Sequence, residues 1–108
     1  MRLTETPVSI SVLHHEGPTR AVASADNMGD FWWISRVLVE PRSQRGQGVG
    51  SEMLQLIQQA VVRQGCTELR VCPGGYDNDT ERQFRFYQKL GFQTFPDEPE
   101  MLFWRPEQ

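Results

Sequence analysis

The fold is decided by residues 31–63, which read FWWISRVLVEPRSQRGQGVGSEMLQLIQQAVVR. Residues 31–40 are rich in aromatic and β-branched side chains, which predicts a central β-strand. Pro41 ends that strand because proline cannot donate a hydrogen bond to a sheet. Apolar residues from Met53 to Val61 then recur at helical spacing, and Gly65 stands where a left-handed residue would end the helix. The stretch therefore predicts a strand, a glycine-rich loop and a helix in direct succession.

The sequence on either side of this stretch predicts short strands and a second helix. Thr80 and Gln83 match the capping-box pattern and indicate a helix from Thr80 to Leu90, which Gly91 ends. Residues 14–18 contain Gly and Pro and are interpreted as a turn. Strands are predicted at residues 8–12, 21–25, 68–72, 92–95 and 101–104. The expected fold is a mixed α/β (α+β) domain, with a single, largely antiparallel sheet and a central strand-helix-strand crossover.

Length and composition limit the class of protein. The 108 residues suit one domain, and 38% hydrophobic with 23% charged residues is ordinary for a globular chain. A net charge of −3 argues against a nucleic-acid partner. No apolar run approaches the ~20 residues of a membrane span, and the start of the chain lacks a signal-peptide pattern. Two cysteines are too few for a disulfide framework and show no metal-ligand spacing. We therefore expect a soluble, cytoplasmic, single domain over residues 1–108, without a metal.

The glycine-rich loop is the strongest chemical signal. Gly46, Gly48 and Gly50 lie at alternate positions between the predicted strand and helix. Their missing side chains expose a run of backbone N–H groups, and the positive end of the helix dipole follows. Arg42 and Arg45 add guanidinium groups that suit phosphate oxygens. The loop therefore predicts a phosphate or pyrophosphate site, and a flexible glycine turn that caps the helix is the structural alternative.

Two common nucleotide-binding patterns do not fit this loop. A P-loop requires Gly-Lys-Ser/Thr, and no Lys is present here. In the dinucleotide pattern G-x-G-x-x-G, the third glycine would fall at Ser51. That pattern also needs an acidic residue at the end of the next strand, whereas Glu68 begins it. Both nucleotide classes are therefore excluded.

Arg45-x-x-Gly48-x-Gly50 after a hydrophobic strand resembles the acyl-CoA loop of the GNAT superfamily of N-acetyltransferases. The second signature of that family is F-Y-x-K-x-G-F on a later helix. Residues 86–92 (FYQKLGF) fit it at every fixed position, and one predicted strand separates the two motifs, as in the family. The resemblance covers roughly residues 8–104.

The resemblance implies an enzyme that moves an acetyl group from acetyl-CoA to a primary amine by direct attack. Tyr87 would be the catalytic residue that donates a proton to the departing CoA thiolate. A tyrosine that only packs in an apolar arc with Phe84, Phe86 and Leu90 is the alternative. The implied contacts with coenzyme A involve the strand before the loop, the loop itself and the start of the second helix: Leu38, Val39, Arg45, Gly46, Gln47, Gly48, Val49, Gly50, Ser51 and Thr80.

This sequence departs from the family pattern at its beginning. Full members usually begin with a strand and two helices that cover the acceptor cleft. Here a strand begins by about Val8, so this cover is expected to be absent or reduced. An open groove suits a bulky acceptor or completion by a second copy of the chain. Trp32 and Trp33 are candidates for an exposed aromatic face there, and the alternative places one of them in the core.

The general base is not assigned by the resemblance. The family often carries a glutamate on the strand that here holds residues 31–34, where no carboxylate is present. Composition offers Asp30, Glu40, His14 and His15, and each also fits an ordinary solvated position. A water chain to solvent, or an amine that arrives neutral, would also serve. The acceptor amine stays open between small molecules and proteins. The missing base and cover also suit an acyl-CoA-binding module without transferase activity.

Overall fold

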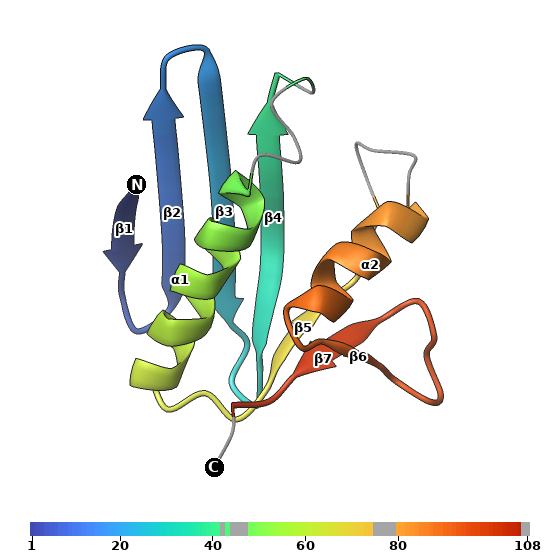
Figure 1. Ribbon diagram of the computed structural model, residues 1–108. Helices are drawn as coiled ribbons and strands as arrows, with labels where there is room; N and C mark the ends of the chain where they lie inside the picture. Colours follow the sequence, from blue (N-terminus) through green and yellow to red (C-terminus); the bar gives the residue numbers. More distant parts are fainter. Residues whose placement is uncertain (42, 44–47, 75–79, 107–108) are drawn as a thin grey trace.

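The computed structural model describes residues 1–41, 43, 48–74 and 80–106. In these residues, seven strands form one sheet and two helices lie on the same face of it (Figure 1). The elements, in chain order, are β1 (Arg2–Glu5), β2 (Ser9–Glu16), β3 (Thr19–Asn27), β4 (Trp32–Glu40), α1 (Val49–Arg63), β5 (Leu69–Val71), α2 (Thr80–Lys89), β6 (Gln93–Thr94) and β7 (Leu102–Trp104). Neither described helix is long and apolar enough to cross a membrane.

The strand order confirms the predicted fold class. The order is β1-β2-β3-β4-β5-β7-β6, which places β4 in the centre. Every neighbouring pair is antiparallel except β4 and β5, which are parallel because α1 crosses between them. Both helices end at glycines in the left-handed region, Gly65 with φ +78° and Gly91 with φ +95°. Both stops were predicted from the sequence.

The beginning of the sheet differs from the prediction. β1 was missed because Leu3 is its single apolar residue, and it forms by pairing with β2, where Leu3 lies opposite Val12. The predicted turn at residues 14–18 was also wrong in part, since β2 continues to Glu16. The connection between β1 and β2 is a tight turn in which the Thr6 hydroxyl donates to the Ser9 carbonyl oxygen at 3.1 Å. Within residues 1–41, no helix separates these two strands.

The hydrophobic core lies between the sheet and α1. Three buried alanines of β3, at positions 21, 23 and 25, present small side chains toward the helix, so α1 can approach the sheet closely. The helix contributes its predicted apolar face: Met53, Leu54, Ile57, Ala60 and Val61 are all buried. At the C-terminal end of α1, Glu5 of β1 accepts hydrogen bonds from Arg63 at 2.8 Å and from Gln64 at 2.7 Å. These contacts hold the helix across β2, β3 and β4.

β4 contains a β-bulge at Ser35. Ser24 of β3 pairs with Arg36 and Ala25 pairs with Ile34, so Ser35 is one residue extra on β4. The Ser35 and Ser24 hydroxyl oxygens lie 3.0 Å apart. Before the bulge the even-numbered Ile34 is buried, and after it the odd-numbered Val39 is buried. The extra residue bends the strand and keeps both halves facing the core.

β4 and β5 diverge just before this bulge. They pair through only two residues of β4: Trp32 opposite Leu69 and Trp33 opposite Arg70. The second half of β4 then runs away from β5, and α2 lies beside the diverging strands (Figure 1). The family resemblance implied a strand that splays from its neighbour, and this geometry confirms that expectation.

The tryptophans and cysteines were only partly predicted. Trp32 is 3% exposed and belongs to the core, so the idea of an exposed Trp32–Trp33 face is wrong for Trp32. Trp33 is half-buried on the opposite face, and its ring meets the edge of Phe31 with centroids 6.5 Å apart. The two cysteines are free thiols; Cys66 is half-buried and Cys72 is exposed.

We predict that Gly91→Ala destabilises the protein more than Gly65→Ala. Both glycines follow a helix at positive φ, where a non-glycine residue costs roughly 1–2 kcal/mol. A Cβ atom at Gly91 would also approach Cδ1 of Trp104 to 3.3 Å, whereas one at Gly65 would meet nothing within 4 Å. Urea unfolding of both variants measures the difference, and equal losses of unfolding free energy would contradict the contact with Trp104.

Candidate functional site

The start of α1 presents backbone N–H groups without a side-chain cap. Gly48 is the N-cap residue, with φ +86°, and makes no side-chain hydrogen bond to the helix. The first intrahelical bond runs from the Glu52 N–H to the Gly48 carbonyl oxygen at 3.0 Å. The N–H groups of Val49, Gly50 and Ser51 therefore have no intrahelical acceptor. Together with the positive end of the helix dipole, they can bind an anion.

Two glycines of the predicted loop have different surroundings. Among the described residues, nothing lies within 4 Å of a Cβ atom placed on Gly48. A Cβ atom on Gly50 would lie 3.4 Å from Cε1 and Cζ of Phe86. Phe86 of α2 therefore lies beside the first turn of α1 at Gly50. This contact joins the two sequence motifs, because Phe86 begins the second one.

Tyr87 lies next to this contact and is 5% exposed. Its ring packs edge-on against Phe86, with centroids 5.0 Å apart, and against Phe92, at 5.3 Å. Burial raises the pKa of the Tyr87 phenol above its ordinary value, so the group stays protonated at neutral pH. Tyr87 therefore packs in the core, and it also keeps the proton that a donor needs.

The strand that precedes the loop contributes the second half of β4. Leu38 is half-buried there and Val39 is buried. Their strand pairs with β3, in which Ala21 lies opposite Val39, while its pairing with β5 has already ended at Trp33. The described residues thus bring together the diverging part of β4, the uncapped start of α1 and the motif on α2.

Thr80 is the first residue of α2 and is exposed. Near it, the side-chain oxygen of Gln83 accepts a hydrogen bond from the Gly74 backbone at 2.8 Å, which ties the first turn of α2 to the segment after β5. Gln83 was expected in a capping box, and this bond to Gly74 is a contact that the sequence did not predict.

Four of the predicted loop residues cannot be placed. Arg42, Arg45, Gly46 and Gln47 lie outside the described residues. The contacts predicted for Arg45, Gly46 and Gln47 with coenzyme A therefore stay predictions.

Three of the four candidate bases lie at one end of the sheet. Asp30 precedes β4 and Glu40 ends it, so the whole strand separates them. His14 and His15 are successive residues of β2 and face opposite sides of the sheet. His14 lies 3.8 Å from the carboxylate of Glu16. His14, His15 and Glu40 line one groove at this end of the sheet, and Asp30 lies at the other end of β4.

Glu68, predicted only as the start of a strand, is a buried carboxylate. Its side chain is 10% exposed and forms ion pairs with Arg70 and with Arg105, the latter at 3.0 Å. Its backbone oxygen accepts a hydrogen bond from Trp32 at 2.9 Å. Arg70 also stacks over the ring of Phe31, 4.0 Å from its centroid. Glu68 therefore fastens the junction of β4, β5 and the end of β7.

The chain matches a known protein family over most of its length. Residues 9–94 match the family described as acetyltransferase (GNAT) domain. This chain belongs to the GNAT acetyltransferase family. The match spans both sequence motifs and all elements from β2 to β6, so it confirms the resemblance inferred from the two motifs. No curated protein matches the sequence.

Solved structures show the same GNAT fold. The anti-CRISPR protein AcrVA5 superposes with a TM-score of 0.70 at 18% identity, over 87% of this chain and 97% of that one. An aminoglycoside 6'-N-acetyltransferase complexed with coenzyme A gives 0.75 at 15% identity, over 94% and 76%. The PaiA N-acetyltransferase from Thermoplasma acidophilum, in complex with coenzyme A, gives 0.74 at 14% identity, over 92% and 62%. At these identities the likeness establishes the fold.

Proposed function

We propose that this GNAT protein is an acetyl-CoA-dependent N-acetyltransferase that transfers the acetyl group to a primary amine by direct attack. The observation that carries the proposal is the divergence of β4 from β5 beside the uncapped start of α1. An extended chain can lie along a strand that has lost its neighbour, and its phosphates can reach the helix N-terminus. Membership of the acetyltransferase family supports this assignment.

Acetyl-CoA binds along these elements in the proposal. The backbone of Leu38 and Val39 holds the pantetheine arm, and the amides from Arg45 to Ser51 hold the pyrophosphate. Thr80, exposed at the start of α2, adds a polar contact. Two similar structures are complexes with coenzyme A, which supports the same ligand here. No described side chain crowds Gly48, which supports a close approach of phosphate to the backbone.

The reaction needs one proton donor on the protein. The amine nitrogen forms a bond to the acetyl carbon, the carbon–sulfur bond breaks, and the CoA thiolate takes a proton from Tyr87. Burial keeps the phenol protonated at neutral pH, so its hydroxyl can donate a hydrogen bond to the sulfur as negative charge develops there. Holding the amine and the thioester in line supplies much of the rate acceleration. The amine releases its own proton to water, and a proton from water restores the Tyr87 phenol.

The proposal also covers the acceptor and the cellular location. One similar structure is an aminoglycoside acetyltransferase, which supports a small amine, and the tight turn between β1 and β2 leaves room for a protein amine as well. We place the protein in the cytoplasm, where its two free thiols stay reduced.

A panel of amines incubated with acetyl-CoA tests the proposed reaction. The panel holds aminoglycosides, polyamines, free lysine and peptides with free N-termini, and a thiol reagent measures released CoA. We expect at least one amine to raise thiol release above the rate without an acceptor, with mass spectrometry showing an acetylated product. Micromolar binding of CoA with no turnover of any amine would replace the enzyme by the acyl-CoA-binding module.

Tyr87→Phe separates proton donation from packing. The substitution keeps the ring and its contacts with Phe86 and Phe92, and it removes only the hydroxyl. We expect turnover to fall about 100-fold, while CoA affinity measured by calorimetry stays within about twofold of the unmodified protein. An unchanged rate at an unchanged melting temperature would leave Tyr87 as a packing residue.

Gly48→Val tests the anion site. Valine at φ +86° is strained, so the first turn of α1 must shift away from the position in which its N–H groups meet the pyrophosphate. We expect CoA binding to be lost while the circular dichroism spectrum stays native. Gly29→Val is the matched control, since Gly29 has φ +99° with equally open surroundings and lies before β4, at the opposite end from the loop. Equal CoA affinity of the two variants would place the anion site elsewhere.

A further inference from the structure

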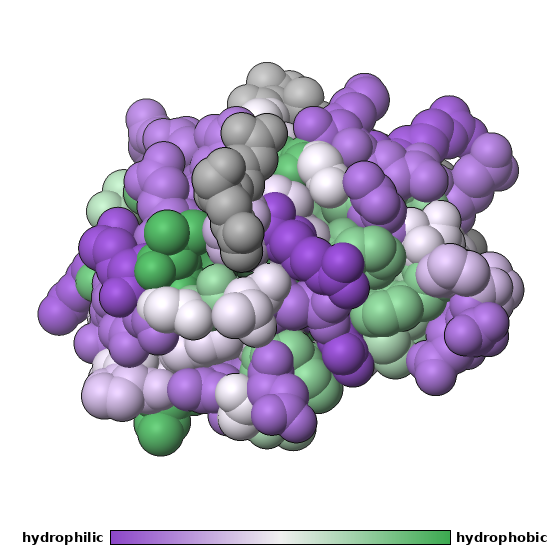
Figure 2. Space-filling view, turned by 90° about the horizontal axis from the view of Figure 1, so that it is seen from below, coloured by the Kyte–Doolittle hydropathy of each residue, from purple (hydrophilic) through white to green (hydrophobic). Residues whose placement is uncertain are grey.

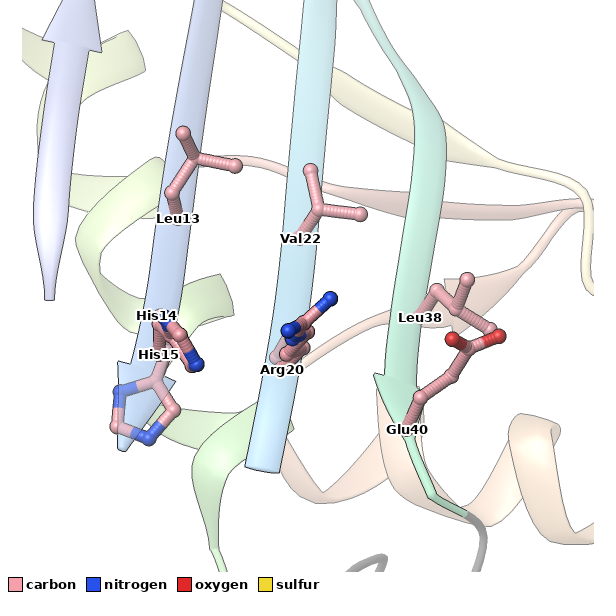
Figure 3. A pocket seen from close by; sticks show the side chains of 8 residues that line it. Leu13, His14, His15, Arg20, Val22, Leu38 and Glu40 are labelled. Atoms are coloured by element: carbon pink, nitrogen blue, oxygen red, sulfur yellow. The ribbon is translucent and has the colours of Figure 1, made fainter. Parts of the chain in front are cut away.

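The helix-free face of the sheet carries a shallow groove of about 380 Å³ across β2, β3 and β4. Two rows of cross-strand partners line it (Figure 3). The first row is apolar and the second is polar: Leu13, Val22 and Leu38, then His15, Arg20 and Glu40. The pairing register of β2, β3 and β4 therefore brings together side chains that are far apart in the sequence.

The apolar row is partly exposed to solvent. Leu13 is 53% exposed, and Val22 and Leu38 are half-buried beside it. Among the described elements, both helices pack on the other face and leave this row uncovered. The end of the molecule seen in Figure 2 differs, because its hydrophobic residues form separate patches among hydrophilic ones. Contiguous apolar residues with a polar rim are typical of an interaction surface.

The charged residues of the groove are arranged in a complementary way. Arg20 of β3 lies directly opposite Glu40 of β4 in the register, and both side chains are exposed. Oppositely charged neighbours on adjacent strands commonly attract each other. In the part of the chain that the structure describes, neither side chain takes part in an ion pair. One positive and one negative group thus stay available at the edge of the apolar row.

We infer that this face is the contact between two copies of the chain. Consider a two-fold axis that runs parallel to the strands, midway between β3 and β4. It places Arg20 opposite the partner subunit's Glu40, and Val22 opposite the partner subunit's Leu38. The same rotation creates each contact twice, as a symmetric dimer requires. The register of β3 and β4 therefore makes the face complementary to itself.

The size of the face agrees with this partner. The molecule measures 37 × 30 × 21 Å along its principal axes, so its broad faces offer room for the ~800 Å² per subunit that a stable dimer buries. Two sheets can pack face to face at about 10 Å, with their side chains interdigitated. An unrelated protein would need a matching pair of charges at the same spacing, which the second copy already has. The inference does not rest on the proposed enzymatic function.

The test measures the mass of the full chain by light scattering coupled to gel filtration at micromolar concentration. We expect twice the chain mass of 12.5 kDa. Arg20→Glu and Glu40→Arg each place like charges opposite one another twice, so each should raise the dimer dissociation constant at least about tenfold. The double variant Arg20→Glu/Glu40→Arg restores opposite charges across the axis, and we expect it to recover the dimer.

A control variant and a folding check separate loss of the dimer from loss of the fold. Lys89→Glu reverses an exposed charge on α2, on the other face, and should leave the dimer intact. Circular dichroism checks that each variant is folded. A monomeric unmodified chain, a dimer indifferent to both single reversals, or a double variant that stays dissociated would overturn the inference. Assays of CoA binding and thiol release on the same samples show separately whether the proposed function holds.

Discussion

The pairing of the central strand constrains everything else in this structure. β4 pairs with β3 along its length, while β5 follows it only at Trp32 and Trp33. The additional residue at Ser35 bends β4 at the point where the second partner is lost. Without that residue, the alternation of side chains would turn either Ile34 or Val39 away from the core. The divergence is therefore built into a strand that remains fully packed on its helix side.

The proposed site uses groups that also hold the fold together. Phe86 lies beside the first turn of α1 at Gly50, and the same turn offers the N–H groups proposed to bind pyrophosphate. Tyr87 fills the space between Phe86 and Phe92, and the resulting burial keeps its phenol protonated. Substitutions here must therefore be judged by two measurements, one of stability and one of chemistry. Tyr87→Phe suits this purpose because it removes a hydroxyl and little volume.

The sequence was most informative where a local pattern determines the outcome. The aromatic and β-branched run of β4, the apolar spacing of α1 and the two glycine stops are short-range signals, and all were predicted. β1 escaped prediction because Leu3 alone does not form a pattern, and pairing with β2 stabilises it. The ion-pair cluster around Glu68 was not predicted, because Arg105 is distant in sequence and reaches Glu68 only through the fold. Its other partner, Arg70, is two residues away. The two family motifs made up for much of this missing information, because the family resemblance implies a fold as well as a function.

By itself, the sequence determined the family, the order of the main elements and the residues on which the proposed chemistry depends. Those properties follow from local periodicity and from two motifs of fixed spacing. The tertiary structure alone decided that Gly50 and Phe86 touch, that Trp32 is buried while Trp33 is not, and that Arg20 lies opposite Glu40. Each of these depends on strand register or helix packing. A shift of one residue in register would move a side chain to the other face, and no local pattern records that choice.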